Sequence, residues 1–427
     1  MSLKRRIGVA VSEAMTSETL AARRRRWREL GRRLRRQAHV IHYFHDIEDP
    51  YSLLAAAALP GLAARSGVRV EPRLVPPPPD WAAPERAMLD AHARRDATAL
   101  ARHYGLDVPR FAGPMAPEAA RAGLSRLADA LARGRFNEEA AAITAAAWRG
   151  EGATSAGDPA PLLAAGAALR DRLGHYLGAT FHYAGEWYWG LDRLHYLERR
   201  LDALGADSDD PSPQFPRPQL RLEPAFAGQL QGRDLDLFFS FRSPYSYIVL
   251  PRVFALADHY GARLNLRFIL PMVMRGLPVP LSKRLYIVRD TKREASAEGL
   301  PFGRIADPLG RPVERGLAIL HHALQQGDDR GRAFALSFLK GVFAEGIEAG
   351  DDRGLGLLAE RAGLNRSAAL AAVADDGWRA VAEANRQAMV GLGLWGVPSL
   401  RFGETFTWGQ DRLWLIEDAM IATARGL

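Results

Sequence analysis

The stretch Phe239-Ser-Phe-Arg-Ser-Pro-Tyr-Ser-Tyr247 decides how the second half of this 427-residue chain folds. It starts inside the short, Phe-rich apolar run 235–241, which predicts a buried strand. Pro244 is favoured in the first turn of a helix, so we expect a helix from there to about residue 259. Ser243 would then open that helix, where its hydroxyl and the backbone N–H groups favour an anion. The alternative is an N-cap Ser that makes only a local hydrogen bond.

The segments that follow complete one α/β core. Two short strands, 399–402 and 405–407, are separated by Gly403-Glu404 as a hairpin turn. The other expected elements are a strand over 263–269, a helical, Ala-rich region over 282–391 with breaks at 350–354 and 375–377, and a helix over 412–424. The order βαβ, helical insertion, ββα is that of a thioredoxin-like core. Such a core places a cis-proline beside its first helix, and Val397-Pro398 stands at that position.

The first half of the chain repeats the second. At an offset of 194 residues, Asp49-Pro-Tyr-Ser52 aligns with Ser243-Pro-Tyr-Ser246. Further along, Trp189-Gly-Leu-Asp-Arg-Leu194 parallels Trp408-Gly-Gln-Asp-Arg-Leu413. Several such matches in the same order predict a tandem duplication. We expect four segments: a basic amphipathic helix (1–38), a degenerate thioredoxin domain (39–204), a stiff Pro-rich linker (205–233) and a second thioredoxin domain (234–427).

Composition excludes several classes of protein. The chain has no Cys, which removes disulfides, thiolate zinc sites, Cys nucleophiles and dithiol redox chemistry. No apolar run reaches the roughly 18 residues of a membrane span, since the longest, 53–64, is broken by Pro60 and Gly61. The start of the sequence does not have the order of regions of a secretory signal. We therefore expect a cytoplasmic protein.

The basic charge is confined to one arm. The formal net charge is +8, but the segment from Lys4 to Arg36 alone carries +9, so the rest is nearly neutral. In this arm Leu20, Trp27, Leu30 and Leu34 recur at helical spacing among many Arg residues. We expect an amphipathic helix whose apolar stripe docks on the protein and whose Arg residues face solvent. The alternative is an arm that binds an anionic surface, either nucleic acid or membrane.

A second candidate cluster is His39, His42 and His45, which invites a metal site. Side chains alternate along a strand, so His42 would point away from the other two and the three cannot converge. We expect no metal here.

Four motifs together resemble one known family. They are the 239–247 stretch, Lys283-x-x-Tyr-x-x-x-Asp290, Gly396-Val-Pro398 and Trp408-Gly-Gln-Asp-Arg-Leu413. They look like the DsbA-type thioredoxin superfamily, most of all the branch of kappa-class glutathione transferases and 2-hydroxychromene-2-carboxylate isomerases. The resemblance covers residues 234–427 and, more weakly, 39–204. It implies an α/β protein of two tandem DsbA-type domains, each with an inserted helical subdomain, and glutathione as the cofactor.

The resemblance implies roles for the residues around the first helix. Ser243 matches the Ser that contacts the glutathione sulfur, and Val397, before the cis-Pro398, matches the backbone that pairs with the cysteinyl part. A Ser hydroxyl at a helix N-terminus can lower the pKa of a bound thiol from about 8.5 toward neutrality. In the isomerase branch that thiolate would add to a conjugated enone, allow rotation about the former double bond, and leave.

Three more residues receive roles from the same resemblance. Gln410 and Asp411 match the pair that holds the γ-glutamyl end of glutathione. Lys283 matches a Lys near the glycyl end or the substrate, and its charge suits a carboxylate; the alternative is a solvated helix residue. The segment 272–280 departs from the family, because it is short and has no Asn. Met272, Met274 and Trp395 could line an apolar pocket, although we expect core packing for at least two of them.

The first half departs further from the family pattern. Asp49 stands at the Ser243 position and Leu89 at the Lys283 position. Alignment of Gly178-Ala-Thr180 with Gly396-Val-Pro398 puts Thr180 at the proline position. A carboxylate would repel a thiolate, so we expect a catalytically silent domain that supports the active one, as an internal pseudo-dimer partner.

These observations favour a glutathione-linked isomerase or transferase that acts on a conjugated or aromatic small molecule. One alternative is a DsbA-family oxidoreductase relative without dithiol activity. The other is a non-enzymatic binding module whose basic arm recruits an anionic partner. Assembly into a homo-oligomer is compatible with each of them.

Overall fold

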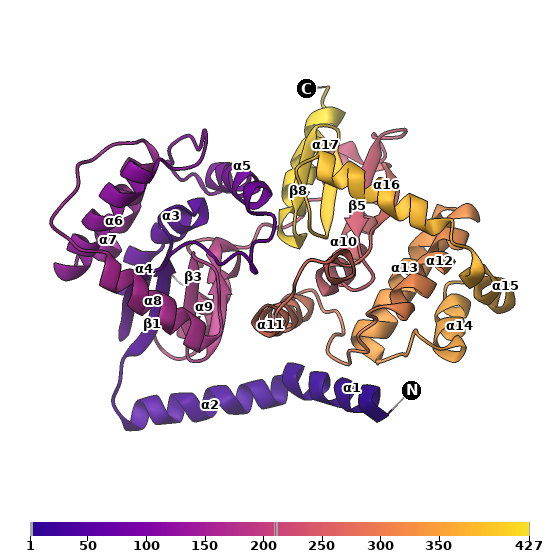
Figure 1. The fold of residues 1–427 in the computed structure, drawn as a ribbon, viewed down its shortest axis with the longest axis horizontal. Helices are drawn as coiled ribbons and strands as arrows, with labels where there is room; N and C mark the ends of the chain where they lie inside the picture. Colours follow the sequence, from indigo (N-terminus) through magenta and orange to yellow (C-terminus); the bar gives the residue numbers. More distant parts are fainter. Residues whose placement is uncertain (1–2, 209, 211, 427) are drawn as a thin grey trace. The chain divides into compact units, whose positions relative to one another are not determined.

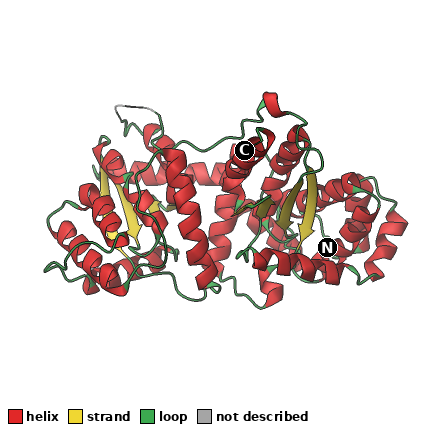
Figure 2. Ribbon diagram, turned by 90° about the horizontal axis from the view of Figure 1, so that it is seen from above, coloured by secondary structure: helices red, strands yellow, loops and turns green. Residues whose placement is uncertain are grey.

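The computed structural model describes residues 3–208, 210 and 212–426 (Figure 1). Asp209 and Pro211 of the expected linker, like both ends of the chain, lie outside the described residues. The chain divides into two compact units, which are described separately. One unit is Ala22–Arg217, and the other combines Met1–Ala21 with Pro218–Leu427. Each contains one four-stranded sheet that is surrounded by helices (Figure 2).

The strands of the C-terminal unit follow one another along the chain as predicted, and the structure adds their order in the sheet. Its strands are β5 (Asp234–Phe239), β6 (Arg263–Phe268), β7 (Ser399–Phe402) and β8 (Thr405–Trp408), arranged β6-β5-β7-β8. β5 and β6 are parallel, whereas β7 pairs antiparallel with both β5 and β8. Helix α10 (Pro244–Tyr260) connects β5 to β6, and α17 (Leu413–Ala424) follows a 3₁₀ turn, η5 (Gln410–Arg412). This confirms the βαβ and ββα elements of a thioredoxin-like core.

The insertion between β6 and β7 is helical. It contains α11 (Leu281–Ala297), α12 (Arg311–Gln325), α13 (Asp328–Lys340), α14 (Asp352–Arg361), α15 (Arg366–Ala371) and α16 (Trp378–Gly391). The expected breaks near 350 and 375 are present, and further breaks at 298–310, 326–327 and 362–365 were not predicted. The insertion shares a core with the sheet, since the Phe241 ring stacks on Phe338 of α13 at 4.0 Å. Gly316 of α12 permits this contact, because a Cβ there would lie 2.5 Å from the Phe338 ring.

The N-terminal unit has a sheet of the same plan. Its strands are β1 (His39–His45), β2 (Val68–Leu74), β3 (Thr180–Tyr183) and β4 (Glu186–Trp189), arranged β2-β1-β3-β4 with the same parallel and antiparallel pairings. The helices are α3 (Pro50–Ala56), α4 (Leu59–Ala64), α5 (Arg86–Tyr104), α6 (Pro117–Ala132), α7 (Phe136–Trp148), α8 (Ala160–Leu173) and α9 (Gly190–Asp202). Both units therefore have a mixed α/β architecture.

Strand register corrects the expected alignment of Thr180 with Pro398. Thr180 pairs with Phe44, whereas in the other sheet the residue that pairs with Phe238 is Ser399. The residue at the Pro398 position is therefore Ala179. Main-chain bonds agree, since the carbonyl of Ala179 accepts from the N–H of Gly190 at 2.8 Å and that of Pro398 from Gly409 at 2.9 Å. The alignment of Gly178 with Gly396 is therefore one residue out of register with the pairing of the strands.

The basic arm differs from the expectation in two ways. It forms two helices, α1 (Leu3–Thr16) and α2 (Glu18–Leu34), with an interruption at Ser17. α1 packs on the C-terminal unit, where Val9 lies against Gly346. The predicted docking of α2 by its apolar stripe is wrong, because the four apolar side chains named above are all exposed. Arginines make the contacts instead: Arg25 pairs with Glu186, and Arg28 donates to the carbonyl of Ala184.

The Pro-rich segment that joins the two sheets is largely non-helical but is not a free linker. Phe215 and Leu230 are buried, and the only helical turn in its described part is a 3₁₀ turn, η1 (Pro224–Phe226). The N–H groups of Arg221 and Leu222 donate to the carboxylate of Glu417 on α17. Across the described ranges, we find no helix with both the length and the apolarity to cross a membrane.

Candidate functional site

The structure places Ser243 at the start of α10, as the sequence predicts. Its backbone is extended, and its Oγ accepts a hydrogen bond from the N–H of Ser246 at 3.1 Å, so it is the N-cap. The same Oγ donates to the carbonyl of Val397 at 3.3 Å. The Val397-Pro398 peptide bond is cis, as expected. The hydroxyl therefore makes both the local bond and a contact to the segment before β7.

The surroundings of this corner are buried, while the corner itself stays accessible. Ser243 and Val397 are partly exposed, whereas Ser240 and Ser246 are buried, with the Ser240 N–H donating to the Ser246 Oγ at 3.4 Å. Gly396 is required, because a Cβ at this position would lie 2.6 Å from the indole Nε1 of Trp408. The Ser243 hydroxyl and the Val397 carbonyl therefore lie side by side at a partly exposed position.

Lys283 lies in the first turn of α11, the helix that packs on α10. A hydrogen bond fixes the two helices, since the Tyr245 hydroxyl donates to Oδ2 of Asp290 at 2.8 Å. Asp290 follows Lys283 by seven residues, so both lie on one face of α11. Burial lowers the pKa of Lys283 below its ordinary value. The side chain is half-buried and is not the fully solvated Lys of the alternative interpretation.

Gln410 and Asp411 begin η5, directly after the residue that bonds to the cis-proline. Gln410 is 1% exposed, and its amide is occupied within the protein. Its Nε2 donates to Oε2 of Glu294 at 2.9 Å, and its Oε1 accepts from Arg252. Asp411 is partly exposed. The position predicted for the γ-glutamyl contact thus holds the carboxylate of Asp411, which accepts a hydrogen bond from Gln410 Nε2. The Gln410 side chain also joins α10 to α11 through Arg252 and Glu294.

Sequence reasoning missed the residues that support this arrangement. Arg252 of α10 reaches both Gln410 and, at 3.3 Å, Glu298 at the end of α11. No spacing signal marks this Arg. The Tyr245–Asp290 bond could have been found from the repeat, because both halves of the sequence have a Tyr and an Asp that are 45 residues apart. In the N-terminal unit Tyr51 and Asp96 make the same bond at 2.7 Å.

Two of the three proposed pocket residues pack in or against the core. Met274 packs against the main core, and Trp395 is buried with its ring 4.7 Å from that of Trp408. The carbonyl of Trp395 accepts from Arg275 at 3.0 Å. Met272 begins the 3₁₀ turn η2 (Met272–Arg275) and is partly exposed. Core packing of at least two residues is therefore confirmed.

The corresponding corner of the N-terminal unit has carboxyl groups. Asp49 caps α3, with its Oδ1 accepting from the Tyr51 N–H at 3.0 Å. Burial, and secondarily the charge of Asp90, raises the pKa of Asp49 to about 7. Burial and then the charge of Asp49 raise the pKa of Asp46 well above its ordinary value. Negative charge is thus disfavoured here, and a second anion would be disfavoured further.

The three histidines of β1 do not converge. His42 faces Glu71 at 3.3 Å on one side of the sheet. On the other side, Nδ1 of His39 lies 2.5 Å from the Tyr183 hydroxyl and Nε2 of His45 lies 3.0 Å from Thr144 Oγ1. This alternation is as predicted, and among the described residues no three His, Asp or Glu side chains form a group that could hold a metal ion.

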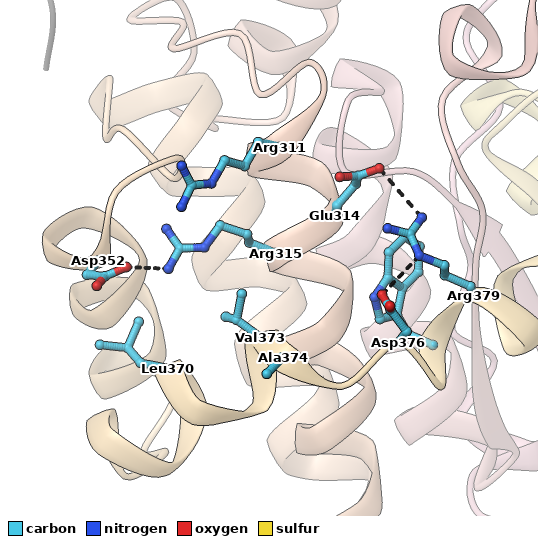
Figure 3. A pocket seen from close by; sticks show the side chains of 10 residues that line it. Arg311, Glu314, Arg315, Asp352, Leu370, Val373, Ala374, Asp376 and Arg379 are labelled. Carbon is cyan, nitrogen blue, oxygen red and sulfur yellow. Dashed lines mark hydrogen bonds and ion pairs between the residues drawn. The ribbon is translucent and has the colours of Figure 1, made fainter.

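A cavity of about 580 Å³ lies elsewhere, among the helices of the insertion (Figure 3). No residue of the predicted site lines it. Its charged groups other than Arg311 pair with one another: Arg315 with Asp352, and Arg379 with Glu314 at 3.5 Å and Asp376 at 3.0 Å. These mutual pairs neutralise most of the charge that could bind a ligand, so the cavity carries no assigned chemistry.

Comparison with known proteins finds similarities to the C-terminal half of the chain. Residues 234–420 match the DsbA-like thioredoxin domain. The chain is 26% identical to 2-hydroxychromene-2-carboxylate isomerase from Pseudomonas putida over 197 residues. The aligned residues are 44% of this chain and 93% of the relative. The enzyme of the same name from Pseudomonas sp. strain C18 is 26% identical over 196 residues, which are 44% of this chain and 89% of the relative.

Solved structures show weaker likenesses. A 2-hydroxychromene-2-carboxylate isomerase is 24% identical with a TM-score of 0.39, covering 45% of this chain and 97% of that one. The cytosolic disulfide reductase DsbM from Pseudomonas aeruginosa is 20% identical with a TM-score of 0.35, over 45% and 97% of the two chains. The similarity of this chain to known proteins is thus a match of residues 234–420 to the DsbA-like thioredoxin domain, together with low-identity relatives that are named isomerases.

Proposed function

We propose that the C-terminal domain is a glutathione-dependent isomerase or transferase that acts on a conjugated or aromatic small molecule. The observation that carries the proposal is the position of the Ser243 hydroxyl, which caps α10 and lies 3.3 Å from the carbonyl of Val397 beside the cis-proline. The two contacts expected for the cysteinyl part of glutathione thereby meet at one accessible point. The absence of Cys from the chain means that a thiol must come from a bound molecule.

The residues present fit glutathione in kind. Its cysteinyl main chain would pair with Val397, its γ-glutamyl ammonium would lie at Asp411, and a carboxylate of glutathione or of the substrate would lie at Lys283. Each pairing joins groups of complementary charge or hydrogen-bonding capacity. Partial burial of Lys283 strengthens its attraction for a carboxylate, because fewer water molecules compete.

The protein's own contribution is electrostatic. Bound glutathione would supply a nucleophilic sulfur that adds reversibly to an activated double bond. The Ser243 hydroxyl would turn its hydrogen from the Val397 carbonyl toward that sulfur, and the N-terminus of α10 would add its positive end. Ser243 acts as a hydrogen-bond donor and forms no covalent bond. Lys283 would attract the negative charge of the substrate, which orients the substrate without a proton transfer.

We further infer that the chain arose by tandem duplication and that its N-terminal domain does not activate a thiol. The two sheets share strand order and pairing. A Tyr–Asp bond also recurs, in each unit between the helix that follows the first strand and the first α-helix after the second strand. Asp49 occupies the capping position of Ser243, where its carboxyl group would repel a thiolate.

Isothermal titration calorimetry with glutathione tests the proposal on the full chain. We expect binding to the wild type, and weaker binding by about 10- to 100-fold for Ser243→Ala, since a hydrogen bond to a charged group contributes about 1.5 to 3 kcal/mol. Ser337→Ala is the matched control, because Ser337 on α13 donates only to the carbonyl of Leu358. An absence of heat with the wild type at millimolar glutathione would refute the proposal.

A further inference from the structure

One face of α2 is apolar and is exposed in the described part of the chain. Trp27, Leu30 and Leu34 are 73%, 47% and 77% exposed. They succeed one another by three and four positions, so they form a single stripe along the helix. Exposure of three large apolar side chains in one stripe is costly in water, and such patches mark interaction surfaces.

The opposite face of α2 is attached to the N-terminal unit. Arg25 makes two bonds of 2.7 Å to Glu186, and Arg28 donates to the carbonyl of Ala184. Arg25 precedes Trp27 by two positions, and Arg28 precedes Leu30 by two. Two positions turn about 200° around an α-helix, so the attached and the apolar faces point in opposite directions. The apolar stripe therefore cannot fold onto the unit while these bonds hold.

The apolar stripe lies among positive charges. Arg23 and Arg26 are exposed and have no hydrogen bond or ion pair among the described residues. From their positions four and one residues before Trp27, they lie within the stripe and along its edge. Ion pairs within α2 stabilise the helix without any packing of the stripe, because Glu29 pairs with Arg32 at 2.8 Å and with Arg33 at 2.6 Å.

We propose that this face of α2, formed by Arg23, Arg26, Trp27, Leu30 and Leu34, binds the surface of a membrane that contains anionic lipids. Lipid headgroups complement the arginines, and the acyl boundary accepts the tryptophan and leucines. A second copy of the chain fits less well, since it would bring like charges together. Nucleic acid would use the arginines but leave the apolar side chains in water. The inference is independent of the glutathione proposal.

Co-sedimentation with sucrose-loaded vesicles tests this on the full chain. Vesicles of phosphatidylcholine alone are compared with vesicles that also contain phosphatidylglycerol. We expect at least ten-fold stronger partition onto the anionic vesicles. Trp27→Ala/Leu34→Ala should weaken it at least ten-fold, and Arg23→Gln/Arg26→Gln about five-fold for each Arg removed. Salt should weaken the binding, because it screens exposed charges.

Matched controls come from other exposed positions. Leu357→Ala on α14 removes an exposed leucine, and Arg110→Gln removes an exposed arginine, and neither should change partition. Circular dichroism verifies that every variant is folded. Equal binding to neutral vesicles, no binding to either kind, or binding unchanged in both α2 variants overturns the proposal. A dimer in light scattering that Trp27→Ala/Leu34→Ala dissociates would overturn it as well, because the face would then serve a second copy.

Discussion

Replacement of Asp49 by Asn should make the N-terminal domain more stable at neutral pH. Asp49 caps α3, and burial together with the negative charge of Asp90 disfavours its ionised form; the charge of Asp49 in turn raises the pKa of Asp46. Asn is as good an N-cap as Asp, so the variant keeps the bond to the Tyr51 N–H. It removes only the charge, which the folded domain disfavours.

The sign and size of the effect follow from the pKa. The pKa of Asp49 is about 7 in the folded domain against an ordinary value of 3.8, so the folded state binds more protons between these values. The free energy of unfolding therefore falls as pH rises through this window, by at most about 4 kcal/mol in all and about 2.5 kcal/mol between pH 5 and pH 8. The side chain keeps some exposure, which makes these figures upper limits. The neutral amide that Asp49→Asn introduces would also relieve the repulsion on Asp46, in the same direction.

Hydrogen exchange read by mass spectrometry measures this in the N-terminal domain alone. Peptides that cover β1 and α3 report the free energy of opening for wild type and Asp49→Asn at pH 5 and pH 8. The variant should gain stability over the wild type at pH 8 and much less at pH 5. Equal stability differences at both pH values would show that the charge of Asp49 does not destabilise the folded domain. Glutathione binding should be unchanged, and its loss in a folded Asp49→Asn variant would refute the assignment of a silent domain.

Three further predictions concern the C-terminal domain. Ser243→Asp should keep the N-cap and the thermal stability but abolish glutathione binding in calorimetry, because a carboxylate repels the thiolate; retained binding would contradict the role of the hydroxyl. Tyr245→Phe should cost about 1 to 3 kcal/mol in urea unfolding, since it leaves the buried Asp290 carboxylate without this donor, and an unchanged midpoint would refute this. Gly396→Ala should lower stability by about 1 to 3 kcal/mol and alter the fluorescence of Trp408, because the new Cβ meets the indole; wild-type stability would show that the indole can move.

The sequence predicts the core elements for which the local residue pattern agrees with the order of elements in a thioredoxin-like fold. An apolar run followed by Ser-Pro specifies the strand, the cap and the helix, and the βαβ order then puts Val397-Pro398 beside Ser243 although 154 residues separate them. The position of Gln410 was predictable for the same reason. Its burial was not, because Arg252 and Glu294 come from distant helices with no pattern to mark them.

Two errors have distinct physical causes. The periodicity of α2 correctly indicated an amphipathic helix, but periodicity does not say which face meets the protein, and here Arg25 finds Glu186 while Trp27 remains exposed. The misplacement of Thr180 arose because short motifs do not determine strand register. Register depends on pairing across the sheet, which only the structure supplies.

If Ser243 stabilises the thiolate of bound glutathione, the pKa of the bound thiol should lie below that of the free thiol. The chain has no Cys, so the ultraviolet absorbance of thiolate during a pH titration comes from glutathione alone once a matching titration with S-methylglutathione is subtracted. With excess wild-type protein the thiol should titrate at least about one unit below its free value of about 8.5, and Ser243→Ala should return it by about one to two units. A bound thiol that titrates like free glutathione, or equally in both proteins, would contradict the account.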